Sequence, residues 1–75
     1  MKELLEVIAK SLVDNPEMVD VKEVAGENSI ILELKVSQQD MGKIIGKQGR
    51  VAKAIRTVVK AAAIKENKRV VVEII

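Results

Sequence analysis

The chain has 75 residues, of which 48% are hydrophobic and 32% charged, so it can form one small globular domain but is too short for two. It contains neither Cys nor His, which excludes disulfides, thiolate metal sites and acid–base catalysis by histidine. The net charge of +2 is unevenly distributed: residues 41–65 contain seven basic residues and no acidic one, and the rest contains six basic and eleven acidic residues. The basic segment is expected to attract a polyanion.

The first half of the chain predicts a helix followed by two strands. Apolar residues at helical spacing predict a helix over residues 3–13, which Asp14-Asn15-Pro16 ends. A weakly alternating strand is predicted over 18–24 and a stronger one over 29–36, with a turn at 25–28 between them. The stronger strand alternates strictly, so we expect a hairpin with one buried side.

The second half predicts two helices and a final strand. Ser37 is expected to cap a short helix that runs through Ile45, with Asp40 as the acidic residue of a capping box. A longer helix follows over residues 50–64, then a turn at 66–68 and a β-branched strand over 70–75. The expected apolar face of the longer helix consists of Val51, Ile55, Val58, Val59 and Ala62.

These elements follow in the order α-β-β-α-α-β. A three-stranded sheet with three helices packed on one face would bury every apolar stripe in a two-layer α+β domain, and we expect that fold over residues 1–75. No apolar stretch is long enough to predict a signal peptide or a membrane span, so we expect a cytoplasmic protein without membrane insertion.

The segment Gly46-Lys47-Gln48-Gly49 lies between the two predicted helices. Two glycines around two polar residues allow a tight turn with positive φ values and close approach of a ligand. The amide groups that begin the next helix lack partners within that helix, so together with Lys47 they can receive a phosphate. A G-x-x-G string alone is most often only a turn, and the surrounding charge decides its meaning.

Basic residues in this region oppose helix stability. Arg50 lies near a helix N-terminus, where a positive charge costs about 0.3–1 kcal/mol. Arg56 and Lys60 form a like-charge pair four residues apart, which costs roughly 0.2–0.5 kcal/mol. A solvated helix face explains the exposure of a basic stripe formed by Arg50, Lys53, Arg56 and Lys60, but it does not explain the absence of every acid. The stripe therefore favours a functional role.

Other nucleotide-binding patterns fit less well. The segment 42–48 departs from a P-loop, because its glycines are one residue too close and Gln48 replaces the hydroxyl that binds Mg²⁺. The complete lack of aromatic residues disfavours modules that stack bases on Phe or Tyr. A KH module remains compatible, since it clamps about four nucleotides with a G-x-x-G loop and needs no aromatic rings.

The run Ile44-Ile45-Gly46-Lys47-Gln48-Gly49-Arg50 matches the I-G-x-x-G signature of KH domains, and nearly the whole chain resembles the small bacterial KhpA family. This resemblance implies a type II KH fold and a cytoplasmic RNA-binding protein that acts as an RNA chaperone. It also implies a KhpB-like partner with its own KH domain and a link to peptidoglycan synthesis and cell elongation. The RNA-binding residues that we expect are Lys43, Ile44, Ile45, Gly46, Lys47, Gln48, Gly49, Arg50 and Lys53.

Our main hypothesis is non-catalytic binding of single-stranded RNA, with no cofactor or metal and with a homodimer or a KH partner to raise avidity. The alternative is a ribosome-assembly or protein-interaction adaptor that uses the basic helix. An enzyme is the third hypothesis, and the chain offers no recognisable catalytic constellation for it.

Overall fold

The computed structural model describes all 75 residues. Its elements in chain order are α1 (Lys2–Leu12), β1 (Asp20–Ala25), β2 (Ser29–Lys35), α2 (Met41–Ile45), α3 (Arg50–Lys65) and β3 (Arg69–Ile74). One-turn 3₁₀ helices at Pro16–Met18, Gln38–Asp40 and Lys47–Gly49 connect them. The predicted order α-β-β-α-α-β is confirmed, with small shifts at the element boundaries.

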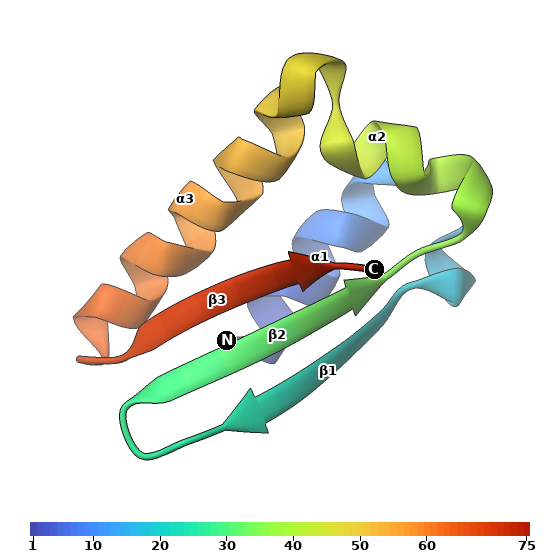
Figure 1. Ribbon diagram of the computed structural model, residues 1–75. Helices are drawn as coiled ribbons and strands as arrows, with labels where there is room; N and C mark the ends of the chain where they lie inside the picture. Colours follow the sequence, from blue (N-terminus) through green and yellow to red (C-terminus); the bar gives the residue numbers. More distant parts are fainter.

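The three strands form one mixed sheet in the order β1-β2-β3. The β1–β2 hairpin is antiparallel, with Val21 opposite Leu34, and β2 pairs in parallel with β3, with Ile30 opposite Val70. Strand β3 therefore lies at an edge of the sheet, and its outer side carries no further strand (Figure 1).

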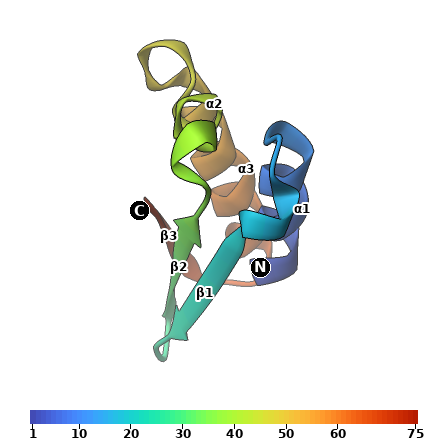
Figure 2. The same cartoon turned by 90° about the vertical axis from the view of Figure 1, so that its right-hand side faces the viewer.

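The helices cover one face of the sheet, so the predicted two-layer α+β fold is confirmed. Figure 2 shows α1 and α3 on the same side of the strands and α2 beyond the end of the sheet. Alternate residues of β2 point toward these helices, and the core consists of Leu5, Ala9, Val21, Ile30, Leu32, Leu34, Val36, Ile44, Ile55, Val59 and Val72. Residues of the opposite register, such as Val24 and Val71, are exposed on the uncovered face.

Helix α3 buries a slightly different face from the predicted one. Ala52, Ile55, Val59 and Ala63 are its buried residues, spaced three or four apart as one helical stripe requires. Val58, which we expected on the buried face, is 49% exposed. The helix carries apolar residues over a wide arc, and the small side chains of Ala52 and Ala63 let it approach the sheet on their side. The apolar arc therefore extends beyond the core.

Asp40 corrects the predicted capping box. No side chain caps the 3₁₀ turn that it ends, and the hydroxyl of Ser37 is buried without a hydrogen-bond partner. The Asp40 carboxylate, only 1% exposed, instead accepts hydrogen bonds from the Asp14 N–H (3.1 Å), the Asn15 N–H (3.0 Å) and the Asn15 side-chain amide (3.1 Å). Three donors from the α1–β1 connection outweigh a local cap, so Asp40 ties that connection to the start of α2.

The environment of Asp40 lowers its pKa. Burial alone would raise the pKa of this carboxyl, but the hydrogen bonds from Asp14 and Asn15, together with the nearby Lys43 ammonium, bring it below its ordinary value. The carboxylate is therefore held in its charged form.

Candidate nucleic-acid interface

Residues 46–49, called the glycine loop here, make a sharp reversal between α2 and α3 (Figure 1). Three of the four residues have positive φ: Gly46 at 75°, Gln48 at 57° and Gly49 at 74°. A Cβ on Gly46 would lie 2.7 Å from the Cβ of Val51 and 2.8 Å from its backbone nitrogen, whereas a Cβ on Gly49 would meet nothing within 4 Å. Gly46 therefore permits close packing of the loop on α3, and Gly49 leaves open space beside it.

The glycine loop leads directly into the N-terminus of α3. Gly49 is the N-cap residue of this 16-residue helix, and no side chain accepts a hydrogen bond from its first turn. The positive end of the helix dipole and the first-turn amides thus face the loop without a carboxylate to neutralise them. Lys47 and Arg50 add two cations at the same place.

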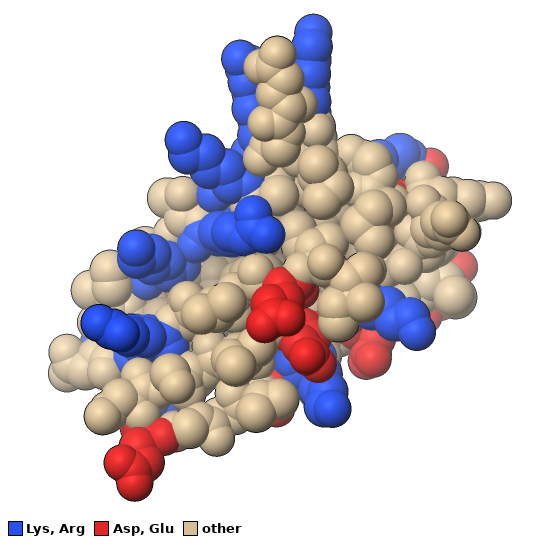
Figure 3. All heavy atoms as spheres, viewed as in Figure 1, with Lys and Arg blue, Asp and Glu red and all other residues tan.

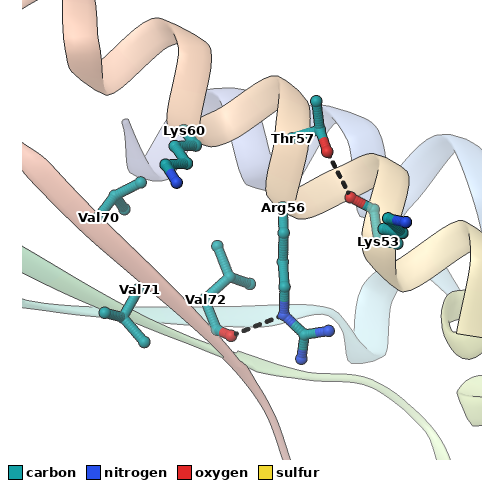
Figure 4. A pocket seen from close by; sticks show the side chains of 7 residues that line it. All are labelled: Lys53, Arg56, Thr57, Lys60, Val70, Val71 and Val72. Carbon is teal, nitrogen blue, oxygen red and sulfur yellow. Dashed lines mark hydrogen bonds between the residues drawn. The ribbon is translucent and has the colours of Figure 1, made fainter.

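A groove of about 360 Å³ runs between α3 and β3. We call it the α3–β3 groove, and Figure 4 shows its lining residues Lys53, Arg56, Thr57, Lys60, Val70, Val71 and Val72. The basic side chains come from the exposed side of α3, and the facing wall is the outer edge of β3. One wall of the groove is therefore positively charged, and the other is the unpaired backbone edge of β3.

The backbone of β3 alternates between its neighbour strand and the groove. The N–H groups of Arg69 and Ile75 donate to the Asn28 and Leu34 carbonyls on the β2 side. Successive residues of a strand point their polar groups to opposite sides, so the N–H and C=O of Val70 and Val72 point to the free edge. The Arg56 Nε–H donates to the Val72 carbonyl across 3.3 Å, which agrees with this orientation.

Most cations of the basic segment have no acidic partner. Lys43 bonds to Asp14, and the other ion pairs of the chain lie within the first six residues. Lys47, Arg50, Lys53, Arg56 and Lys60 form none. In Figure 3 the Lys and Arg side chains gather above and along the side of the molecule where α3 lies. The result is a continuous positive track from the glycine loop to the α3–β3 groove.

The predicted site residues differ in exposure. Lys47, Gln48, Arg50 and Lys53 are exposed and Gly49 is half-buried beside them, so these residues can meet a ligand. Ile45 is 36% exposed at the base of the loop.

The other predicted residues are placed differently. Ile44, which we expected among the RNA-binding residues, is fully buried in the core, so its side chain anchors α2 and cannot reach a ligand. Lys43 is engaged by Asp14 beside the Asp40 carboxylate. Its charge is thus partly committed within the fold.

The sequence-based set omitted part of the groove. Arg56 and Lys60 belonged to the basic stripe but were not included among the site residues, and no residue of β3 was included. Periodicity identifies a strand without showing which side of it remains unpaired. The sequence signal that could have indicated this groove is a basic helix followed by a short turn and a final strand.

Comparison with known proteins identifies the family. The family described as "KhpA/KhpB, KH domain" matches residues 2–74. The chain belongs to this KhpA/KhpB KH-domain family. It is 83% identical to the RNA-binding protein KhpA of Clostridium perfringens and 79% identical to that of Clostridium acetobutylicum, in both cases over the full length of both chains.

More distant members of the KhpA/KhpB family agree with this assignment. The RNA-binding protein KhpA of Aquifex aeolicus is 48% identical over all of this chain and 95% of its own length. All three relatives carry the name RNA-binding protein KhpA. No solved structure matches the chain significantly.

No helix combines the length and the apolar character that a membrane crossing requires. No three side chains of His, Cys, Asp or Glu converge as a set that could ligate a metal ion.

Proposed function

We propose that this KH domain, over residues 1–75, binds single-stranded RNA without catalysis. The glycine loop would hold phosphates, and the α3–β3 groove would receive the bases. The observation that carries the proposal is the groove itself, because unpaired cations on α3 face the open edge of β3 there. The names of the KhpA relatives describe RNA binding, which supports the same conclusion.

The architecture favours unpaired RNA over a duplex. The N–H and C=O groups of Val70 and Val72 on the open edge of β3 can bond only to a base whose edge is not already paired. Aromatic rings for stacking are absent, so phosphate contacts would supply most of the affinity. Binding should be weak for one module and sensitive to salt.

A charge-reversal variant of the glycine loop tests the proposal. Lys47→Asp combined with Gln48→Asp places two anions where phosphates would lie, and it should abolish binding of fluorescein-labelled single-stranded RNA in an anisotropy titration. The matched control is Lys22→Asp with Ser29→Asp, which changes the net charge equally at exposed positions of β1 and β2. Far-UV circular dichroism verifies that both variants fold. Full binding by the folded loop variant would refute the proposal.

A second KH domain is the proposed protein partner. Helices α1 and α3 enclose a separate hollow of about 480 Å³, the α1–α3 groove, lined by Leu4, Ile8, Leu12, Arg50, Val51, Ala54, Ile55 and Val58. Such an apolar surface is well suited to pack against another α3. The family name joins KhpA with KhpB, which supports a homodimer or a KhpB-like partner at this surface.

The oligomeric state tests this surface. Val58→Asp should convert a dimer to a monomer in light scattering coupled to size-exclusion chromatography, because it buries a charge in an apolar contact. Val7→Asp, at a 63% exposed position of α1 outside the groove lining, is the control and should remain dimeric. A Val58→Asp dimer as tight as the native one would rule out the α1–α3 groove.

By family resemblance we extend the proposal to a cytoplasmic RNA chaperone linked to peptidoglycan synthesis and cell elongation. The competing adaptor function would also use the basic helix, but it predicts no preference for unpaired strands. Titration with single-stranded and duplex RNA of the same sequence separates the two. Equal affinity for both forms would favour the adaptor.

A further inference from the structure

The face of the sheet that the helices leave uncovered carries a row of branched apolar side chains. The strand register aligns one such residue from each strand, and Figure 2 shows the helices on the other side of the sheet. Val24 and Val71 are 45% and 51% exposed, and Ile31 between them is half-buried. We call these three residues the apolar row. A row of this kind is a surface on which a second sheet can pack.

Charged residues flank the apolar row on both sides along the strands. Two positions after Val71, Glu73 lies directly opposite Glu33, and like charges in such positions repel each other. Two positions before Val71, Arg69 lies opposite Ser29. None of these three charged side chains forms an ion pair within the chain. The apolar row therefore separates two repelling carboxylates from a guanidinium without an anionic partner.

The same face of a second copy complements this pattern in one orientation. Sheets that stack face to face lie about 10 Å apart, with their strands within about 30° of each other. A two-fold axis along the apolar row places each strand over the same strand of the second copy, in the opposite direction. Arg69 then lies over Glu73 of the second copy and Glu73 over its Arg69, while each Ser29 faces a Glu33. The apolar row meets itself in the centre.

The other two-fold arrangement of the two faces is less favourable. An axis parallel to the strands through Ile31 also stacks the apolar row on itself, but it places Glu33 over Glu33 of the second copy. It pairs Glu73 with Lys22 of the second copy and leaves Arg69 without an anion. Only the axis along the apolar row joins opposite charges without opposing like ones.

We propose that the uncovered face of the sheet is an interface for a second copy of the chain, held by the apolar row and by reciprocal ion pairs between Arg69 and Glu73. This sheet-face contact is separate from the α1–α3 groove, which the helices form. Three strands about 4.8 Å apart and three rows of residues about 6.8 Å apart give roughly 300 Å² per copy, well below the about 800 Å² of a stable complex. The contact is therefore weak and forms at high local concentration.

The α3–β3 groove stays accessible in such a pair. Its basic side chains belong to α3, on the helical side of the sheet, and Figure 4 shows the Val71 side chain pointing away from α3. Two copies would therefore present two grooves to one RNA strand, and their effective concentration on that strand would strengthen the contact. This consequence, unlike the contact itself, rests on the proposed RNA binding.

An exchange of charges tests the contact in a Val58→Asp background, which disrupts the α1–α3 groove as a competing contact. Sedimentation velocity and amide line widths should show a weak dimer as the protein concentration approaches the millimolar range. Arg69→Glu and Glu73→Arg should each weaken this dimer about tenfold or more, because two ion pairs become two repulsions. The two substitutions together restore opposite charges, and the dissociation constant should return to within about threefold of the background value.

Lys10→Glu is the matched control for net charge. It changes the charge as much as Arg69→Glu does, at an exposed position of α1 away from the sheet, and it should leave the dimer unchanged. Amide spectra verify that each variant folds.

Each outcome supports or overturns the inference. Weakening by both single exchanges, with recovery in the double variant, supports it. A background chain that stays monomeric at millimolar concentration overturns it, and that is also the outcome expected if a different protein covers the face. A dimer that the single exchanges leave intact, or that the double variant does not restore, overturns the proposed pairing. RNA affinity is not measured in this experiment, so none of these results decides the proposed function.

Crosslinking provides a second test that does not depend on charge. The chain contains no cysteine, so a single introduced thiol reports its own distance from the two-fold axis. Ile31 lies on that axis, and a short bismaleimide should join Ile31→Cys chains into dimers in the same background. Glu17→Cys, at an exposed position in the turn after α1, should stay monomeric. Equal crosslinking at the two positions would overturn the inference.

Discussion

Replacing Gly46 with alanine should damage the chain far more than the same change at Gly49. Both glycines have nearly the same positive φ, 75° and 74°, but Gly46 has ψ 175°, in a region essentially restricted to glycine, whereas Gly49 has ψ 13°, in the left-handed helical region. Only at Gly46 would an added Cβ meet other atoms, at 2.8 Å from the backbone nitrogen of Val51. A rotamer change cannot move a backbone nitrogen, and the loop must separate from the start of α3.

The magnitudes follow from these two contributions. Left-handed strain costs about 1–2 kcal/mol at Gly49, and the glycine-only conformation of Gly46 costs about 1–3 kcal/mol. Overpacking adds about 1–3 kcal/mol at Gly46 alone, so Gly46→Ala should lose about 2–6 kcal/mol in total. A domain of this size has about 4–11 kcal/mol of unfolding free energy, so the loss should be large but measurable.

Urea unfolding followed by far-UV circular dichroism measures both variants, and the unfolding midpoint of Gly46→Ala should lie clearly below that of Gly49→Ala. The close contact with Val51 and the glycine-only backbone conformation both occur at Gly46 and not at Gly49. Equal midpoints for the two variants would refute the reasoning, because they would show that neither feature of Gly46 carries energetic weight.

Three other predictions concern the buried carboxylate, the core and the positive track. Because the pKa of folded Asp40 lies below the ordinary value of about 3.9, its contribution to stability is present above that pH and is lost as the pH falls through the folded pKa. Asp40→Asn should remove this part of the pH dependence of the thermal midpoint and lower the midpoint at neutral pH; an unchanged acid profile would contradict the role of Asp40. Leu32→Ala, in the fully buried centre of β2, should cost about 2–5 kcal/mol in urea unfolding. Val7→Ala at an exposed position should cost less than about 0.5 kcal/mol, and similar losses in the two variants would show that the assigned core is wrong. RNA affinity should fall with salt, and Lys53→Met should reduce the slope of log K against log[salt] by about 0.7, the value for one phosphate contact; an unchanged slope would remove Lys53 from the phosphate contacts.

The sequence predicted the elements well because their signals are local. Strict alternation in β2, helical spacing in α1 and the glycines around Lys47 and Gln48 each depend on neighbours within a few positions. The α+β layering then followed from the need to bury each apolar stripe.

Long-range partners account for the errors. Asp40 accepts hydrogen bonds from residues 25 and 26 positions away. A prediction based only on neighbouring residues therefore assigned it wrongly to a capping box. Val58 is apolar like Val59, and only the position of α1 and the sheet decides which of them faces the core. Ile44 was placed among the RNA-binding residues for a related reason, since its neighbour Ile45 reaches the surface and Ile44 does not.

The sequence predicted the positive charge of the candidate site but not the shape of its groove. The acid-free basic segment and the glycine loop indicated where a phosphate would bind, and the structure places them in one track. The open side of β3 and the bond from Arg56 to Val72 depend on strand order, which no local pattern contains.

The position of β3 also has a consequence for how the chain acquires its binding surface. The β1–β2 hairpin closes over a short turn, with Ala25 opposite Ile30, whereas the parallel pair joins Ser29 to Arg69, 40 positions further along the chain. Contacts of such large separation form late, so a chain still emerging from the ribosome would have its glycine loop before it has a groove. RNA that binds along β3 would in turn hold the last strand in place, and resistance to unfolding should rise with RNA concentration.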